Sequence, residues 1–179
     1  MQNLGLSLGI KRVAILGAES SGKSTLAEAL ATHYQSVFVP EYLREFVHIK
    51  QRFPTEIEQI HIAKTQLLRE DEALTHAKNY LFCDTTPIMT ALYSAHYFQA
   101  VNQELEELVV AHNYQFTLVA APDFPWVADG LQRDSAQVRQ KIHEELVNTL
   151  DEREIPFLLL EGSLIKRIEQ VQFAFSFLF

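Results

Sequence analysis

The sequence predicts a doubly wound α/β fold, in which a five-stranded parallel sheet forms the middle of three layers. Two observations predict it. Five short apolar segments alternate with segments of helical periodicity, which is the pattern of strands buried on both faces. A glycine-bounded loop, "GAESSGKST", follows the first apolar segment, where such sheets bind phosphate. We therefore expect residues 1–179 to form one domain, with a helical lid over about 123–140.

Each predicted strand is a run of β-branched, leucine or aromatic residues that a turn-forming or polar residue ends. The run "RVAILG" stops at Gly17, and "SVFVP" stops at Pro40, which cannot donate to a sheet. "NYLFCD" ends at Asp84, "QFTLVAA" is the fourth run, and "PFLLLEG" ends at Gly162. The predicted strands cover residues 12–17, 36–40, 79–84, 115–121 and 156–162.

The segments between these strands carry apolar residues at spacings of three and four, as helices do. Thr55 and Glu58 form a T-x-x-E capping box that opens the longest of them. Its inward face is predicted to carry Ile57, Ile60, Ala63, Leu67 and Leu74. The segment 41–49 is either a helix or a turn. The other predicted helices cover 22–34, 55–77, 87–99, 102–112, 136–152 and 163–176.

Composition excludes several classes of protein. With 47% apolar and 21% charged residues, the chain has the composition of an ordinary globular domain. Its net charge of −8 lacks the basic footprint of a nucleic-acid-binding protein, and no apolar run reaches the roughly 20 residues that span a bilayer. A single cysteine, Cys83, fits a reducing compartment. We expect a cytoplasmic protein without nucleic-acid or membrane partners, and homo-oligomer formation stays open.

The loop from Gly17 to Thr25 fits the pattern G-x-x-x-x-G-K-[ST] and lies between a predicted strand and a predicted helix. Backbone N–H groups in such a loop surround a phosphate, and the helix N-terminus adds positive charge. Lys23 is expected to neutralise the β- and γ-phosphates of ATP, and the Ser24 hydroxyl to bind Mg²⁺. The predicted ATP-binding residues of this loop are Gly17, Glu19, Ser20, Ser21, Gly22, Lys23, Ser24 and Thr25.

Two acidic residues follow predicted strands at the same edge of the sheet. Asp84 could hold the Mg²⁺ shell or accept a hydroxyl proton, and the alternative is that it caps the next helix. Glu41 could be the base for an acceptor hydroxyl, with Arg44 either holding the acceptor's phosphate or orienting Glu41. A solvated ion pair between Glu41 and Arg44 is the alternative.

A polar segment, "WVADGLQRDSAQVR", precedes the helix predicted at 136–152. Its Arg133 and Arg139 are candidates to cover a γ-phosphate and stabilise charge in the transition state; an exposed polar loop is the alternative. After the fifth strand, Gly162 and Ser163 form either an adenine-binding turn or a serine helix cap.

Three tyrosines are candidates to stack on a flat acceptor ring: Tyr42, Tyr93 and Tyr97. Tyr93 and Tyr97 lie four residues apart in a predicted helix, so they share one face of it. Aromatic residues at helical spacing more often belong to the core, and this remains the alternative.

Five segments occur together in an order and spacing that resembles the ribosylnicotinamide kinase domain of NadR-type proteins. They are "GAESSGKSTLAEAL", "VPEYLREF", "CDTTPIMTALYSAHYF", "WVADGLQRD" and "EGS", and the resemblance covers about residues 11 to 168. The resemblance implies a P-loop nucleoside- and nucleotide-kinase-like fold and Mg²⁺-dependent transfer of the ATP γ-phosphate to the 5′-hydroxyl of nicotinamide riboside, in NAD biosynthesis. It implies nucleotide binding by Lys23 and Ser24, a catalytic acid at Asp84, an acceptor side with Glu41 and Arg44, and a lid with Arg133.

The chain departs from the family pattern at three places. Where some members read D-T-D, this chain has Thr86, so the second acid is missing. Where the lid often reads D-G-L-R, Gln132 intervenes, so Arg133 is either shifted by one residue or aimed differently. These 179 residues contain no counterpart of the adenylyltransferase domain of bifunctional members, so we expect another protein to supply that step.

Two other functions compete with a small-molecule kinase. A P-loop ATPase or regulatory nucleotide-binding module would release phosphate to water and needs no acceptor cavity. A polynucleotide 5′-kinase would need a basic track, which the net charge of −8 disfavours. The sequence leaves the identity of the acceptor, the preference for ATP over GTP, and the choice of Glu41 or Asp84 as the base open.

Overall fold

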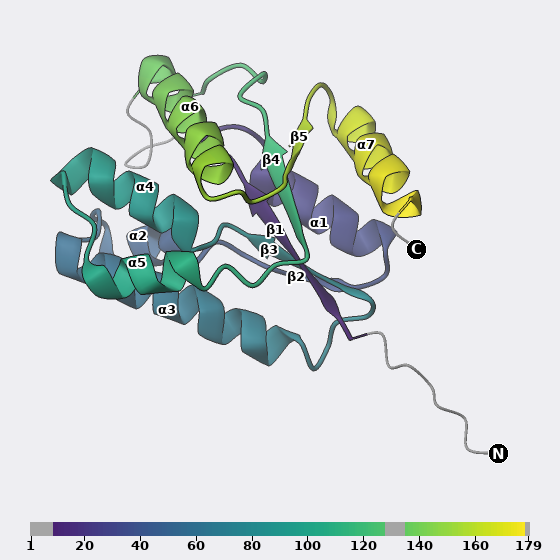
Figure 1. Ribbon diagram of the computed structural model, residues 1–179, viewed down its shortest axis with the longest axis horizontal. Coiled ribbons are helices and arrows are strands. Elements are labelled where there is room, and N and C mark those ends of the chain that lie inside the picture. The colour runs from purple at the N-terminus through teal and green to yellow at the C-terminus, as the bar shows by residue number, and fades with distance from the viewer. Residues whose placement is uncertain (1–8, 128–134, 178–179) are drawn as a thin grey trace.

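A five-stranded parallel sheet in the order β2-β3-β1-β4-β5 forms the middle layer of the computed structural model (Figure 1). The structure describes residues 9–127 and 135–177. The predicted fold class and all five predicted strands are confirmed. The strands are β1 Lys11–Leu16, β2 Val37–Val39, β3 Tyr80–Asp84, β4 Phe116–Ala120 and β5 Leu158–Leu160. The helices are α1 Lys23–His33, α2 Tyr42–Lys50, α3 Glu56–Ala73, α4 Pro87–Phe98, α5 Gln103–Val110, α6 Ala136–Glu152 and α7 Leu164–Ser176.

Both faces of the sheet are covered, because successive side chains of a strand point to opposite faces. Val13 and Ile15 of β1 pack in one core with α1 and α7. Ala14 and Leu16 pack in the other, mainly with α4, α5 and α6. Figure 1 shows α1 and α7 on one side of the sheet and α3 to α6 on the other. This arrangement explains why the strands read as continuous apolar runs.

The direction of strand addition reverses at β1. The chain leaves β1 for β2 on one side and later adds β4 and β5 on the other, so that β1 pairs with both β3 and β4. Ile15 is in register with Asp84, and Leu16 with Val119. Ligands of open α/β sheets bind outside the carboxyl ends of the strands at such a reversal. The loop after β1 therefore lies at the expected binding edge.

The inward face of α3 differs from the predicted one. Ile57 is 83% exposed, so its predicted inward position was wrong, and the helix ends at Ala73 instead of near Ala77. The buried positions are largely polar: Gln59, Ile62, Ala63, Gln66 and Glu70. The capping box of Thr55 and Glu58 is present. Apolar periodicity failed here because this helix meets polar backbone and side-chain groups under the binding edge.

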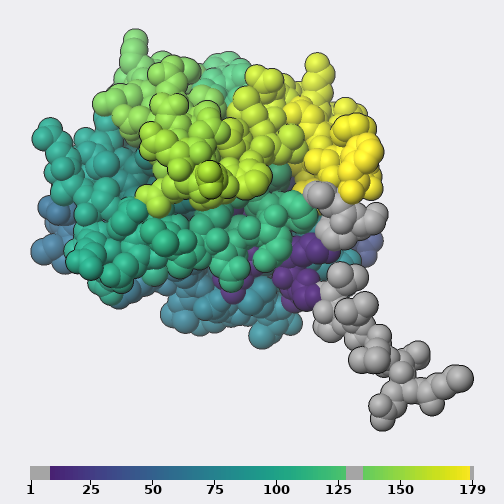
Figure 2. Space-filling model, in the orientation of Figure 1, coloured from purple at the N-terminus to yellow at the C-terminus, as the bar shows by residue number. Residues whose placement is uncertain are grey.

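On the face shown in Figure 2, α5 and α6 form one continuous surface (teal-green and yellow-green). An ion pair joins them, since Arg153 Nη2 lies 2.5 Å from Glu106 Oε1. Within the described residues, no helix is both long and apolar enough to cross a membrane.

A buried carboxyl group, that of Glu70, lies where α3 packs on the sheet. Tyr114 donates a hydrogen bond to it at 2.8 Å, and Arg12 lies 3.4 Å away. Burial raises the pKa of Glu70 to about 7, although Tyr114 and Arg12 both lower it. The folded protein therefore binds a proton at this site at pH values where the unfolded chain does not.

The stability of the protein should fall as the pH rises from about 5 to about 7. The folded state binds more protons than the unfolded state between the ordinary pKa of Glu70 and its raised value, so the free energy of unfolding decreases across that window. The effect is at most roughly 3 kcal/mol. Urea denaturation of the wild type and of Glu70→Gln, which keeps an acceptor for Tyr114, checks this. Parallel pH profiles for the two proteins would contradict it.

Candidate active site

The loop after β1 is held in shape by its own hydrogen bonds. Ser21 Oγ donates to the Ala18 carbonyl at 2.7 Å, and Lys23 Nζ donates to the same oxygen at 3.1 Å. Lys23 is 9% exposed, and α1 begins at this residue. The loop therefore presents its N–H groups and one lysine ammonium at the N-terminus of α1, which is an anion-binding arrangement.

Two glycines permit this shape. Gly17 has a φ of 152°, and a Cβ there would lie 2.9 Å from the Ala120 carbonyl oxygen. Gly22 has a φ of 84°, and a Cβ there would lie 2.8 Å from the Phe124 ring. Side chains at these two positions would separate the loop from β4 and from Phe124, so the glycines of the motif have steric reasons to be there.

Asp84 lies directly behind the loop. It is 1% exposed, and its Oδ2 accepts a 2.6 Å hydrogen bond from the Ser24 hydroxyl. Thr86, not Asp84, is the N-cap residue of α4. Among the described residues, no hydrogen-bond donor reaches Asp84 Oδ1 and no partner reaches Thr86 Oγ1, although both atoms are buried.

These oxygens fit a magnesium ion. Mg²⁺ in nucleotide sites takes one or two protein oxygens and completes its shell with water and phosphate. Ser24 and Asp84 supply such oxygens, with one carboxylate oxygen still available. In the described part of the chain, no cluster of three or more His, Cys, Asp or Glu residues forms a separate metal site.

Glu41 occupies the loop between β2 and α2 and faces the same centre. Its side chain is 14% exposed; Thr85 Oγ1 lies 3.5 Å from Oε1, and Arg44 Nε lies 4.0 Å from Oε2. Burial raises the pKa of Glu41, Lys23 lowers it, and the Asp84 carboxylate raises it further. A carboxylate of raised proton affinity beside a cavity is suited to accept a proton.

A cavity of about 330 Å³ opens beside Glu41. Tyr93 and Tyr97 stack with 14° between their ring planes, and Tyr97 also meets Phe53, so one wall is aromatic. The charged lining residues come from the phosphate loop and the start of α2. We call this the acceptor cavity; its lining includes Gly17, Glu19, Ser20, Lys23, Glu41, Arg44, Phe53, Pro54, Gln59, Thr85, Met89, Tyr93, Tyr97 and Phe98.

A second cavity, of about 310 Å³, lies on the other side of the loop, and we call it the nucleotide cavity. Ser20, Lys23 and Arg44 line both cavities, so the two meet at the lysine. The remaining lining residues of the nucleotide cavity are Gly22, Ser24, Thr25, Phe124, Pro125, Leu164 and Arg167.

Arg167, on α7, was missed by the sequence interpretation, and it joins three loops of the edge. It is fully buried, and its guanidinium donates to the carbonyls of Ser21 at 2.5 Å, Ala121 at 2.9 Å and Gly162 at 3.1 Å. It also pairs with Asp123. An arginine in a C-terminal helix carries no motif signal, because its partners are backbone atoms of distant loops.

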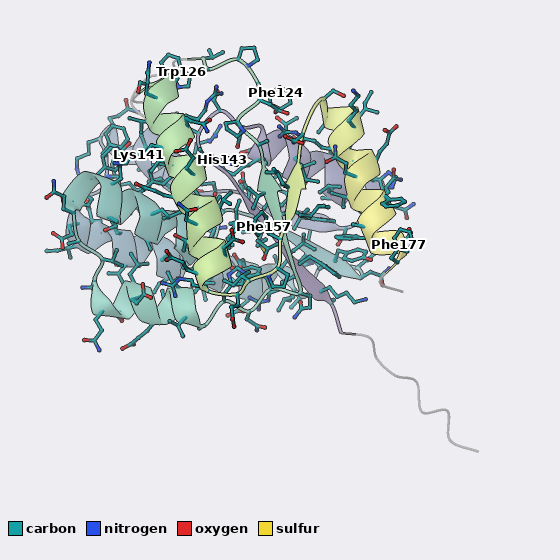
Figure 3. All side chains as sticks on the ribbon, turned by 45° about the horizontal axis from the view of Figure 1, so that its top comes forward. Phe124, Trp126, Lys141, His143, Phe157 and Phe177 are labelled. Carbon is teal, nitrogen blue, oxygen red and sulfur yellow. The ribbon has the colours of Figure 1, made fainter. Side chains whose placement is uncertain are left out.

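The Arg167 guanidinium lies 4.4 Å from the centre of the Phe124 ring. Figure 3 shows Phe124 and Trp126 on the segment that runs from β4 toward α6. Phe124 thus fills the space between α7 and Gly22, at the wall of the nucleotide cavity.

Several predicted site residues lie elsewhere. Tyr42 lines neither cavity; its ring packs under the Arg69 guanidinium at 4.5 Å. Arg139 donates to the Phe124 carbonyl at 2.7 Å and holds that segment instead of a cavity wall. Gly162 N–H donates to Asp123 at 2.5 Å, and Ser163 caps α7. Arg133 and part of the predicted lid lie outside the described residues.

A protein-family profile described as an AAA domain, AAA_28, matches residues 12–167. The chain belongs to the AAA_28 family. The match includes the phosphate loop, Glu41, Asp84 and Arg167, so this AAA_28 protein carries both cavities inside the family region.

Two curated relatives share the resemblance that the motifs predict, which is thereby confirmed. The trifunctional NAD biosynthesis/regulator protein NadR of Escherichia coli is 29% identical over 160 residues, which are 85% of this chain and 38% of that protein. NadR of Salmonella typhimurium is 27% identical over 176 residues, 91% of this chain and 42% of that protein. This AAA_28 chain therefore spans about two fifths of the length of these relatives.

Solved structures show the same fold. A NadR protein in complex with NR superposes with a TM-score of 0.73 at 21% identity, over 86% of this chain and 44% of that one. Deoxyadenosine kinase from M. mycoides superposes with a TM-score of 0.64 at 12% identity, over 92% of this chain and 98% of that one. The fold of this AAA_28 protein is that of P-loop nucleoside and nucleotide kinases.

Proposed function

We propose that this protein is an ATP-dependent kinase that transfers the γ-phosphate to a nucleoside hydroxyl, with nicotinamide riboside as the acceptor and nicotinamide mononucleotide as the product. The observation that carries the proposal is the meeting of two cavities at Lys23. A phosphotransferase needs separate places for donor and acceptor on either side of the transferred group. The NadR relatives, named for NAD biosynthesis, support the choice of acceptor.

The acceptor hydroxyl would lie at the Glu41 end of the acceptor cavity. Asp84 is already bonded to Ser24, whereas Glu41 lines the cavity and has a raised pKa, so Glu41 is the better candidate for the base. Arg44 lines both cavities and can neutralise charge between donor and acceptor. The aromatic wall, near the carboxylates of Glu19 and Glu41, suits a flat cationic ring.

Mg²⁺ would be held by Ser24 and Asp84, and when bound it would neutralise charge on the β- and γ-phosphates. Lys23 adds a second positive charge at the same end of the nucleotide cavity. A cytoplasmic location and homo-oligomer formation stay predictions, as does closure of a lid that carries Arg133.

Nicotinamide riboside should raise ADP release well above the rate with water alone, and nicotinamide mononucleotide should accumulate in proportion. The acceptor cavity gives the physical reason, because a nucleoside bound in it would lie next to Lys23, where the γ-phosphate would otherwise meet only water. A coupled ADP assay with a panel of nucleosides, together with chromatography of the product, measures this. If no nucleoside changes ADP release, a P-loop ATPase becomes the better description.

Glu41→Gln serves as the internal comparison in this assay. It should lower the nucleoside-stimulated rate by about 10²-fold or more while ATP still binds, because the proton acceptor is lost. Glu45→Gln is the matched control, since Glu45 lies about one turn later, on α2, but pairs with Arg69 on the surface.

A further inference from the structure

Among the described residues that line the acceptor cavity, Gln59 is the one with a neutral amide side chain. Several of the other lining residues are charged or aromatic. Gln59 lies in the first turn of α3 and is only 5% exposed. It also lines a small chamber of about 20 Å³ that shares Met89 and Tyr93 with the acceptor cavity. What little surface Gln59 exposes therefore belongs to the walls of these cavities.

Among the described residues, no protein hydrogen bond is found for the Gln59 carboxamide, and its nitrogen and oxygen are not among the fully buried atoms without a partner, so they are accessible from the cavities that Gln59 lines. The neighbouring buried glutamine of α3 behaves differently: Gln66 accepts from Tyr42 N–H at 2.9 Å and donates to the Asp84 carbonyl at 3.4 Å. Buried amides are nearly always hydrogen-bonded, because leaving one without a partner costs free energy. An amide without a protein partner on the wall of a binding cavity is thus available to a ligand.

We propose that Gln59 reads the substituent on the ring of the acceptor and selects a carboxamide over a carboxylate. This inference rests on the proposed function and goes beyond it by naming a specificity-determining residue. A primary amide offers both a donor and an acceptor, which match the donor and acceptor of a ligand carboxamide. A carboxylate offers acceptors only, so it can accept a hydrogen bond from the Gln59 amide N–H but donates none to the Gln59 carbonyl.

The charges of the cavity add to this discrimination. Glu19 and Glu41 line the same cavity, whereas its two cations, Lys23 and Arg44, also line the nucleotide cavity, where they would face the donor phosphates, so a ligand carboxylate would meet two acidic side chains. Like charges in a partly desolvated site repel strongly. Nicotinamide riboside and nicotinic acid riboside share the cationic ring and differ only in its substituent. The Gln59 side chain is therefore the group that would distinguish them.

The test compares nicotinamide riboside with nicotinic acid riboside, which differ only in this substituent. The wild type should phosphorylate the amide riboside with the higher kcat/KM. Gln59→Met, similar in length but without hydrogen-bonding atoms, should lower kcat/KM for the amide riboside by about 10-fold or more, mainly through KM, and reduce the preference between the two ribosides. Gln140→Met, on the exposed face of α6, is the matched control and should match the wild type.

A second variant covers the case in which Gln59→Met does not fold. Gln59→Glu keeps the shape but removes the donor, and it should disfavour the acidic riboside even more strongly than the wild type does. An unchanged ratio of kcat/KM in either variant that folds would overturn the role of Gln59 alone. Phosphorylation of neither riboside by the wild type would overturn the proposed function, and this inference with it.

Discussion

Replacing Lys23 with alanine should lower kcat/KM for phosphoryl transfer by about 10²- to 10³-fold while the protein stays folded. Lys23 lines both cavities, at the point where the proposed function requires the transferred phosphate to pass from one to the other. Among the described residues its ammonium donates a hydrogen bond only to the Ala18 carbonyl, so it can turn toward phosphate oxygens. A charge-assisted contact in a water-poor site is among the stronger polar interactions.

Steady-state kinetics with ATP and nicotinamide riboside measure this effect, and a thermal melt verifies the fold. Lys64→Ala is the matched control, because Lys64 pairs with Glu104 on the surface, where such pairs contribute little. If Lys23→Ala turned over substrate at the wild-type rate, the phosphate loop would have no role in phosphoryl transfer.

Arg167→Met should lower the free energy of unfolding by about 3 kcal/mol or more, which corresponds to a decrease in Tm of roughly 6–12 °C for a chain of this size. Methionine fills a similar volume but donates no hydrogen bond. The carbonyls of Ser21, Ala121 and Gly162 would lose a buried donor together, and Asp123 would lose its ion partner. Breaking such a buried set costs far more than breaking one surface pair.

Thermal denaturation checks this, with and without ATP. Arg153→Met is the matched control, since Arg153 makes one ion pair with Glu106 and is partly exposed. Arg167→Lys tests the geometry: it keeps the charge but not the fork of donors, and it should recover only part of the stability. A Tm for Arg167→Met within about 2 °C of the wild type would contradict the prediction.

The parts of this molecule that could be predicted from sequence are those that local patterns encode. The loop with Lys23 and Ser24 has fixed spacing, and Asp84 ends an apolar run, so both could be placed at one edge of the sheet. Their contact, 2.6 Å between Ser24 Oγ and Asp84 Oδ2, follows from the pairing of β1 with β3. Tyr93 and Tyr97 could likewise be placed on one helix face.

The rest depends on contacts between segments that are far apart in the chain. Arg167 is 146 residues from Ser21, and no spacing rule links the two. Gln59 lies on α3 and Phe53 just before it, and both line the acceptor cavity together with residues of α4. Tyr42 follows Glu41, one of the two candidate bases, but the helical turn of α2 carries its ring to Arg69 and away from the cavity.

The polar inner face of α3 fixes the register of that helix. A helix held by apolar contacts can slide by a fraction of a turn at low cost, because such contacts have no direction. On α3, Gln66 bonds to the backbone of Tyr42 and of Asp84, and one turn later Glu70 bonds to Tyr114. A slide of 1.5 Å, the rise of one residue, would break all of these bonds together. The segments that carry Glu41 and Asp84 in the candidate active site are thus both hydrogen-bonded to one helix, which fixes their positions relative to each other.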